Sequence, residues 1–316
     1  MKDTSPVVAF LFPGQGSQKV GMGKALAEAF PICADTFDEA DAALGVPLSR
    51  VCFEGPEDRL AMTENTQPAI LAVSVAAYRL LASLGVEPAF LAGHSLGEYS
   101  ANVAARTFSF PDALRIVQRR GRFMQEAVPP GAGAMSAILG VDPETVAQAC
   151  EEGAQGDVVS VANMNGARQV VIAGARDAVI RAGERAKALG ARRVVPLPVS
   201  APFHCALMMP AQERLAPELR ALDVHDPRMP IVANVDAEPK CCARAAIEAL
   251  VAQVSAPVRW EAVVQRLASE GVTTYVEVGP GTVLSGLVRK IHHEATVLSF
   301  GSPNDLEVIE PLLRAK

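Results

Sequence analysis

Residues 89–101, with the sequence AFLAGHSLGEYSA, decide what the rest of the chain must provide. A short apolar run ends at Gly93, Ser95 follows, and Gly97 precedes a segment that favours helix. Gly-x-Ser-x-Gly is the pattern of a nucleophile elbow, in which a strand turns sharply into a helix and presents the Ser hydroxyl. Both glycines are expected because a Cβ at either position would clash with the facing strand and helix. We therefore predict that Ser95 is a nucleophile, against the alternative of an ordinary Gly/Ser loop.

The composition indicates a folded, mildly acidic protein. Half of the 316 residues are hydrophobic, which is enough for a core in one large domain or two modest ones. The chain carries 29 basic and 35 acidic residues, a net charge of −6. Broad binding to nucleic acid or to a membrane surface needs a basic excess, so we expect neither partner. A local basic patch for an acidic protein is still compatible with this charge.

The cysteines and the first residues indicate a reduced compartment. The six cysteines lack Cys-x-x-Cys spacing, and Cys241 and Cys242 are adjacent, which suits free thiols better than disulfides. The chain does not begin with the charged start, apolar middle and cleavage site of a signal peptide. No apolar run approaches the roughly 20 residues of a membrane span. We predict a cytoplasmic protein without a metal site or a permanently bound cofactor.

Apolar strands and helical segments alternate along most of the chain. The run 7–12 predicts a buried parallel strand that stops at a Gly-rich loop, and further strands are predicted at 231–234 and 274–278. This alternation predicts a mostly parallel sheet covered on both faces and, with the elbow, a large α/β-hydrolase-like domain. The predicted helices span 22–30, 37–44, 69–84, 110–126, 211–222, 243–254, 258–270 and 283–291.

A segment bordered by prolines has a different pattern. Strands at 133–139, 158–161, 169–173 and 192–197 enclose helices at 142–152 and 176–189. This βαββαβ order over about 70 residues is the ferredoxin-like signature. We predict a ferredoxin-like α+β subdomain of residues 128–198, inserted into a discontinuous catalytic domain of residues 1–127 and 199–316.

A nucleophilic Ser needs a positioned base, which is most often His. His204 follows a loop after a predicted strand, where functional side chains collect, so we predict that it is the base. A buried structural His is the alternative. The other histidines fit less well: His94 lies inside the turn and should point away from the Ser hydroxyl, and the rest look superficial, namely His225, His292 and His293.

Five motifs occur together and in order. They are FPGQGSQ (12–18), GHSLGEYSA (93–101), RGRFMQ (120–125), the loop at 198–207 and EVGPG (277–281). With them the chain resembles, from about residue 7 to about residue 298, the malonyl-CoA:acyl carrier protein transacylases and the related acyltransferase domains of fatty-acid and polyketide synthases. Each motif alone is unspecific, whereas five in register are specific.

The resemblance implies a role for each site residue. Ser95 matches the nucleophile and His204 the general base, which the backbone carbonyl of Gln253 orients. The backbone N–H groups of Leu96 and Gln15 match the oxyanion hole, and no Asp or Glu is needed to complete a triad. The resemblance also implies malonyl-CoA as substrate, and the phosphopantetheine thiol of an acyl carrier protein as acceptor. The reaction is then ping-pong, through a malonyl-Ser95 ester.

Arg120 matches the arginine with which the family holds the free carboxylate of the malonyl group. A planar guanidinium fits a carboxylate, and a charge-assisted hydrogen bond contributes roughly 1.5–3 kcal/mol. Acetyl-CoA would leave this cation desolvated and unpaired, and is therefore disfavoured. The alternative is that Arg120 is one of several surface arginines of one helix, with Arg115, Arg119 and Arg122.

Four further residues are assigned to the pocket. A bulky aromatic residue at the position of Phe203 goes with malonyl rather than methylmalonyl groups in related synthase domains, and a core Phe is the alternative. Met124 is expected in the same pocket. Asn163 and Asn165 match asparagines that the family uses for cofactor contacts, although Asn in a loop often only satisfies backbone groups.

Some positions depart from the usual pattern of the free-standing enzymes. Asn102 stands where an apolar residue is usual, Arg106 where Gly is usual, and 238–242 is also unusual. We expect a role in fatty-acid synthesis, with a discrete acyltransferase of a polyketide pathway as the alternative. A serine hydrolase of acyl thioesters is a further rival, but it would need the order Ser, Asp/Glu, His. A non-catalytic carrier-binding module is another, against which the intact site residues argue.

Carrier proteins are acidic, so the face that binds them should be locally basic. Candidates occur at the edge of the predicted insert and at the end of the last predicted helix, with ordinary solvated charge as the alternative. They are Lys187, Arg192, Arg193, Arg289 and Lys290.

Overall fold

A computed structural model describes residues 6–199 and 201–313, so that Ser200 and both chain ends lie outside the described residues. Its larger sheet has the strand order β10-β9-β1-β2-β7-β8 within this range. Neighbouring strands run parallel, except that β7 and β8 pair antiparallel. The strands are β1 (Val8–Phe12), β2 (Phe90–Gly93), β7 (Ile231–Val232), β8 (Pro239–Lys240), β9 (Thr274–Val278) and β10 (Thr296–Phe300).

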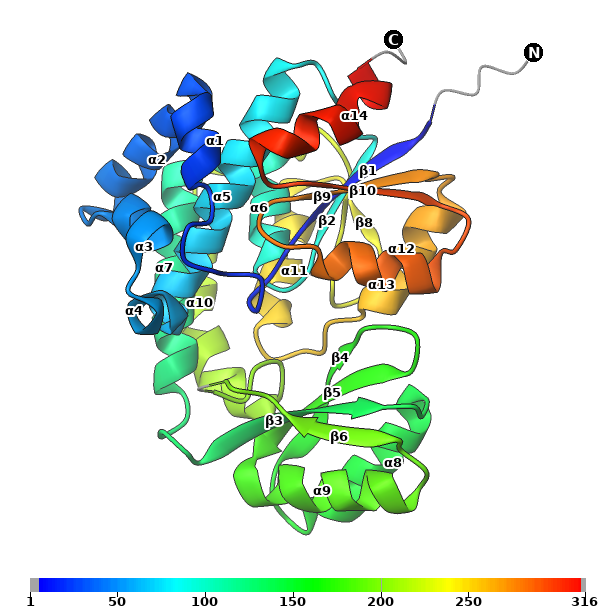
Figure 1. The fold of residues 1–316 in the computed structure, drawn as a ribbon. Coiled ribbons are helices and arrows are strands. Elements are labelled where there is room, and N and C mark those ends of the chain that lie inside the picture. Colours follow the sequence, from blue (N-terminus) through cyan, green and yellow to red (C-terminus); the bar gives the residue numbers. More distant parts are fainter. Residues whose placement is uncertain (1–5, 200, 314–316) are drawn as a thin grey trace.

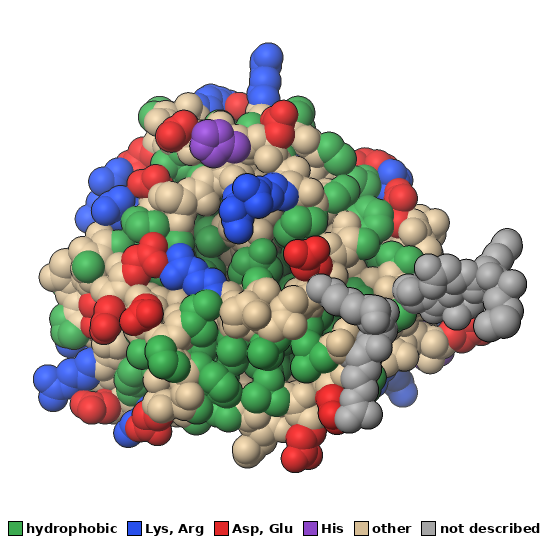
Figure 2. Space-filling model, turned by 90° about the horizontal axis from the view of Figure 1, so that it is seen from above, with side chains coloured by type: hydrophobic (Ala, Val, Ile, Leu, Met, Phe, Trp, Pro, Cys, Tyr) green, Lys and Arg blue, Asp and Glu red, His purple; other side chains and the backbone are tan. Residues whose placement is uncertain are grey.

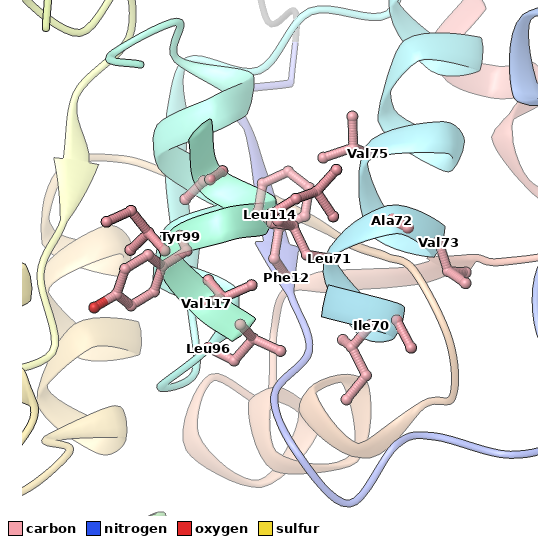
Figure 3. Close-up of a cluster of buried hydrophobic side chains, with 14 of the residues drawn as sticks. Phe12, Ile70, Leu71, Ala72, Val73, Val75, Leu96, Tyr99, Leu114 and Val117 are labelled. Carbon is pink, nitrogen blue, oxygen red and sulfur yellow. The ribbon is translucent and has the colours of Figure 1, made fainter. Parts of the chain in front are cut away.

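Helices cover both faces of this sheet (Figure 1). They are α1 (Lys24–Ala29), α2 (Pro31–Leu44), α3 (Leu48–Glu54), α4 (Glu57–Ala61), α5 (Thr63–Ser83), α6 (Gly97–Ala104), α7 (Phe110–Glu126), α10 (Met209–Arg220), α11 (Ala243–Gln253), α12 (Trp260–Ser269), α13 (Val283–Ile291) and α14 (Leu306–Leu313), with short 3₁₀ turns η1 (Ala206–Met208) and η2 (Pro303–Asp305). Successive side chains of β1 point to opposite faces of the sheet and pack in different clusters. Phe10 and Phe12 belong to the core cluster with α5 and α7, which Figure 3 shows around Phe12. Ala9 and Leu11 pack in a second cluster with α12 and α13.

A smaller, antiparallel sheet lies beside the larger one (Figure 1). Its strands are β3 (Gly133–Leu139), β4 (Val159–Met164), β5 (Gln169–Ala175) and β6 (Arg193–Pro196), in the order β4-β5-β3-β6. Helices α8 (Pro143–Ala154) and α9 (Arg176–Ala188) cover its outer face, where Ile138 and Ile172 are buried. Ala137 and Val171, which alternate with them, belong to the core cluster of the larger part. The smaller sheet is therefore packed on both sides.

Most predicted elements are confirmed, several with the predicted bounds, as for α7, α13, β3 and β9. Helix α5 begins at Thr63 rather than at residue 69, although Pro68 lies inside it. Every residue from 66 to 77 is buried, so packing outweighs the backbone hydrogen bond that the proline removes. Helices α3, α4 and α14 and strands β8 and β10 were not predicted, because they are short and carry little periodic signal.

On the face seen from above, Lys and Arg side chains are interspersed with Asp and Glu and with exposed hydrophobic side chains, so neither sign of charge dominates this face (Figure 2). Among the described residues, no helix is long and apolar enough to cross a membrane.

Candidate active site

The elbow has the geometry that its glycines predict. Strand β2 ends at Gly93, helix α6 begins at Gly97, and Ser95 between them has a left-handed φ of 51°. A Cβ on Gly93 would lie 2.0 Å from the carbonyl carbon of Gly97. A Cβ on Gly97 would lie 1.9 Å from the backbone oxygen of Phe12. Only glycine fits either position, and the tight turn holds Ser95 in a conformation that non-glycine residues seldom adopt.

The predicted base is in contact with the predicted nucleophile. His204 Nε2 lies 2.7 Å from Ser95 Oγ, and His204 Nδ1 lies 2.9 Å from the backbone oxygen of Gln253. A carbonyl oxygen can only accept, so Nδ1 carries the proton and Nε2 presents its lone pair to the Ser hydroxyl. Burial, and then the charge of Arg120, lower the pKa of His204 to about 3. The imidazole is therefore neutral at rest and free to take a proton.

The remaining histidines lie elsewhere. His94 points away from the Ser hydroxyl, as predicted, and its Nε2 lies 3.0 Å from Oδ1 of Asn165. His225 and His293 are exposed. The prediction that His292 is superficial was wrong, because its ring is half-buried and its Nδ1 lies 3.0 Å from the hydroxyl of Tyr275.

Arg120 is buried at the bottom of the site, with 2% of its surface exposed. Its Nη2 donates to Ser95 Oγ at 3.1 Å and to Gln253 Oε1 at 2.9 Å, and its Nη1 donates to Gln67 Oε1 at 2.9 Å. The guanidinium also lies 5.3 Å from the ring centre of Tyr99. No ion pair within the described residues involves Arg120, and its Nε has no hydrogen-bond partner there. Burying a cation without a carboxylate partner destabilises the fold, and a ligand that supplies an anion would offset this cost in free energy.

The neighbouring arginines of α7 behave differently, which contradicts the alternative of a shared surface role. Each of them is exposed and paired with a carboxylate: Arg115 with Asp112, Arg119 with Glu218 and Arg122 with Glu126. Arg120 is the one arginine in this stretch that points inward.

A cavity of about 510 Å³ opens between the two sheets above these groups. The backbone N–H groups of Gln15 and Leu96 belong to residues that line it, and among the described residues neither donates to a protein acceptor. The loop that carries Gln15 packs on the elbow so closely that a Cβ on Gly14 would lie 2.3 Å from the backbone oxygen of His94. Two amide donors are thus available beside Ser95.

The four predicted pocket residues all line the same cavity. Phe203 and Met124 are buried, with 8% and 1% of their surface exposed, and contribute apolar wall. Asn163 and Asn165 reach the cavity from the smaller sheet and its adjoining loop. The predicted docking residues do not line the cavity. They are exposed on α9, at β6 and at the end of α13, namely Lys187, Arg192, Arg193, Arg289 and Lys290.

Three residues that contact the site were not predicted. Asn234 accepts from the Ser95 amide at 2.7 Å and donates to the Gly93 carbonyl at 2.7 Å. Glu98 accepts from Asn234 and from Gln253, and Gln67 holds Arg120. Asn234 is the last residue of a predicted strand. Because the carboxyl ends of parallel strands lie at one edge of a sheet, this position was the signal that could have identified it.

The site contains a hydrogen-bonded Ser–His pair, two amide donors and a buried cation, and it therefore defines an enzyme that transfers acyl groups through a serine. Comparison with known proteins agrees. The sequence model described as "Acyl transferase domain" matches residues 9–304, and the chain belongs to this family.

The most similar relatives include two curated enzymes named malonyl CoA-acyl carrier protein transacylase. That of Escherichia coli K12 is 50% identical over 297 residues, covering 94% of this chain and 96% of the relative. That of Bacillus subtilis 168 is 47% identical over 302 residues, covering 95% of both chains.

Solved structures extend the comparison to the fold. An acyl carrier protein S-malonyltransferase from Vibrio cholerae has a TM-score of 0.94 at 46% identity, covering 96% of this chain and 99% of that one. A malonyl-transacylase in complex with its type II polyketide synthase acyl-carrier protein has a TM-score of 0.93 at 47% identity, covering 95% and 98%. The protein is accordingly an acyltransferase of mixed α/β fold, with a largely parallel sheet and a second, antiparallel sheet. In the part of the chain that the structure describes, no cluster of three or more His, Cys, Asp or Glu could hold a metal ion.

Proposed function

We propose that this enzyme transfers the malonyl group of malonyl-CoA to the phosphopantetheine thiol of an acyl carrier protein, by a ping-pong reaction through a malonyl-Ser95 ester. The observation that carries this proposal is the buried guanidinium of Arg120, which pairs with no carboxylate in the described part of the chain and whose Nη2 lies 3.1 Å from Ser95 Oγ. A malonyl group bound to Ser95 would bring a carboxylate to that cation.

Acylation begins with the proton of the Ser95 hydroxyl. His204 Nε2 takes this proton while Oγ forms a bond with the thioester carbonyl carbon of malonyl-CoA. The negative charge that develops on the carbonyl oxygen is stabilised by the N–H groups of Leu96 and Gln15, each contributing about 3–4 kcal/mol in the transition state. The C–S bond then breaks, and the sulfur of coenzyme A leaves with the proton that His204 returns.

The second half repeats these steps with a thiol as nucleophile. His204 takes the proton of the phosphopantetheine thiol as its sulfur attacks the malonyl ester. The ester C–O bond breaks, and Ser95 regains the proton from the imidazole. Water must be excluded at this stage because hydrolysis of the ester would compete. His204 is buried, with 4% of its surface exposed, and Ser95 is half-buried, which supports such exclusion.

Selectivity among acyl groups follows from the walls of the cavity. Arg120 favours groups that end in a carboxylate, since an acetyl group would leave the cation unpaired. Phe203 and Met124 limit the space beside the α-carbon of the acyl chain and so disfavour a methyl branch. Asn163 and Asn165 present amide groups to the coenzyme A or phosphopantetheine arm. No cofactor is bound permanently in this scheme, since the phosphopantetheine belongs to the carrier protein.

The serine hydrolase alternative is disfavoured by the partner of His204. A hydrolase of the α/β type would orient this imidazole with a carboxylate, whereas here Nδ1 faces the carbonyl of Gln253. The bonded Ser–His pair likewise argues against a non-catalytic carrier-binding module.

We assign the reaction to fatty-acid synthesis, where it supplies malonyl extender units. The neighbour bound to a type II polyketide synthase carrier favours a polyketide pathway as the second candidate. In either case we propose that the acidic carrier docks on the exposed basic residues Lys187, Arg192, Arg193, Arg289 and Lys290. A cytoplasmic location stays a prediction.

We also propose a division into a discontinuous α/β-hydrolase-like domain, residues 1–127 and 199–316, and a ferredoxin-like subdomain, residues 128–198. The βαββαβ order of β3 to β6, and the separate core that α8 and α9 form on one face of that sheet, support this division. The elbow between β2 and α6 supports the likeness to α/β hydrolases.

Intact mass spectrometry after incubation with a panel of acyl-CoAs tests the proposed function. Malonyl-CoA should add one malonyl group per chain, on Ser95, and acetyl-CoA should add far less. Subsequent addition of a carrier protein that bears phosphopantetheine with a free thiol should remove the label as malonyl-carrier rather than as free malonate. Label that persists on Ser95→Ala would contradict the proposed nucleophile.

A further inference from the structure

Glu98 is a buried carboxylic acid directly behind the nucleophile that the reaction scheme does not use. It is the second residue of α6, and 1% of its surface is exposed. One oxygen, Oε2, accepts from Gln253 Nε2 at 2.8 Å and from the Asn234 backbone N–H at 3.0 Å. Burial raises the pKa of this carboxyl to about 7, while its two N–H donors and Arg120 lower it and Asp236 raises it further. Burying a carboxyl group in a protein core costs free energy unless hydrogen bonds compensate, so the bonds that Glu98 makes indicate its role.

The first bond decides which way the side-chain amide of Gln253 faces. Gln253 Nε2 donates to Glu98 Oε2 and, at 2.9 Å, to the Ser95 carbonyl, so that Oε1 faces Arg120 Nη2 at 2.9 Å. If the amide turned over, its NH₂ group would face the guanidinium, donor against donor. Its oxygen would then face the carboxyl and the carbonyl, acceptor against acceptor. Glu98 therefore holds Gln253 in the one orientation that bonds Arg120.

The second bond fixes the turn that carries Ser95. The backbone N–H of Asn234 donates to Glu98. The side chain of Asn234 accepts from the Ser95 amide and donates to the Gly93 carbonyl, each at 2.7 Å. These bonds stabilise the left-handed backbone of Ser95, with φ of 51°.

We infer that Glu98 is a positioning residue for acyl transfer, which fixes the Gln253 amide and thereby aims Arg120 at the carboxylate of the malonyl group. The inference rests on the proposed function. It assigns the malonyl preference to two elements, the cation itself and a buried carboxyl behind it that never touches the substrate.

The test compares acylation of Ser95 by malonyl-CoA and by acetyl-CoA in single turnovers, followed by intact mass. Glu98→Gln keeps an acceptor oxygen and should stay within about threefold of the wild type for both substrates, whereas Glu98→Ala removes the acceptor. A misaimed Arg120 affects chiefly the substrate that carries a carboxylate, because only that substrate bonds the guanidinium. Any loosening of the Ser95 turn through Asn234 affects both substrates and cancels in the ratio of their rates. We therefore expect Glu98→Ala to lower the malonyl rate about 10- to 100-fold, with a raised half-saturating concentration, and to lower the malonyl-to-acetyl ratio by at least about tenfold.

Glu277 provides a matched control for burial. It is also 1% exposed and accepts two backbone N–H bonds, from Leu284 at 3.0 Å and from Ser285 at 2.7 Å, but it contacts neither the nucleophile nor the base. Glu277→Ala should destabilise the fold and leave the malonyl-to-acetyl ratio unchanged.

Two outcomes would overturn the inference: equal losses for both substrates in Glu98→Ala, or a Glu98→Gln variant as impaired as Glu98→Ala. If Glu98→Ala does not fold, Glu98→Asp withdraws the carboxyl by one methylene and should also lower the ratio. Gln253→Met keeps the backbone carbonyl for His204, and adding Glu98→Ala to it should change the ratio no further. A wild type that forms no malonyl-Ser95 would instead refute the proposed function, so the two failures are distinguishable.

Discussion

Replacing Arg120 by Ala is the most direct perturbation of the site, because this side chain is a cation in the cavity wall that pairs with no carboxylate among residues 6–199 and 201–313. One charge-assisted hydrogen bond to the malonyl carboxylate is worth roughly 1.5–3 kcal/mol. Its loss corresponds to a fall of about 10- to 150-fold in kcat/KM for malonyl-CoA. Acetyl-CoA makes no such bond, and removal of an unpaired cation should leave its rate unchanged or raise it.

The same substitution acts on the base. The charge of Arg120 is the second cause, after burial, that lowers the pKa of His204. In Arg120→Ala this pKa should move toward its ordinary value, so the acid limb of the acetyl-CoA reaction should shift to higher pH.

The assay is burst acylation of Ser95, measured by quenched flow and intact mass with each acyl-CoA. Arg119→Ala is the matched control, because Arg119 is adjacent, exposed and paired with Glu218 at 2.8 Å. It should leave both rates unchanged. Arg120→Lys retains the charge without the planar fork and should fall between wild type and Arg120→Ala. Equal losses for malonyl-CoA and acetyl-CoA in Arg120→Ala would refute the reasoning.

Four further outcomes are expected. Gly97→Ala should lower the free energy of unfolding in urea by about 3 kcal/mol or more, because its Cβ would lie 1.9 Å from a backbone oxygen. His204 is buried neutral with a pKa near 3, so the free energy of unfolding, followed by urea titration, should decrease as pH falls from 6.5 toward 3, where the unfolded chain binds the proton first. Phe203→Ser should raise acylation by methylmalonyl-CoA relative to malonyl-CoA by about tenfold in direct competition. Charge reversal of Arg192 and Arg289 together should raise the KM for the carrier protein without changing acylation by malonyl-CoA.

Each of these four predictions has its own control or its own contradicting result. Gly286→Ala, in α13, has open space around its new Cβ and should fold normally. A His204→Gln variant should lose less stability than wild type between pH 6.5 and 3, and parallel curves would contradict the buried neutral imidazole. An unchanged acyl preference in Phe203→Ser would leave Phe203 with a packing role alone. Unaltered carrier kinetics after charge reversal would remove that face from consideration.

Local features of the chain could be predicted where a short pattern determines its own geometry. The spacing of Gly93, Ser95 and Gly97 predicts the turn because the clash of a Cβ is a local property. Helix α7 has a periodic buried face, strand β9 is a continuously buried run, and both have clear breakers near their ends, so their bounds agree with the prediction.

Features that depend on the order of strands could not be predicted in the same way. Asn234 reaches Ser95 only because β7 pairs with β2 in the sheet, and the order of strands in a sheet cannot be read from the sequence. Glu98 stands inside the elbow motif, but its partners come from two distant segments. The edge strand β10 has partly exposed, mixed residues that give no clean alternation.

The hydrogen-bond partner of the base limits which leaving groups the site can expel. A neutral carbonyl, with a cation nearby, gives an imidazolium at His204 little electrostatic support, so the proton is held weakly and returned readily. A sulfur leaving group needs little protonation, because a thiol has a pKa of about 8.5. Breaking a strong amide bond would demand a more firmly stabilised imidazolium. The pair is therefore suited to moving an acyl group between thiols and an alcohol, and it is poorly suited to breaking an amide.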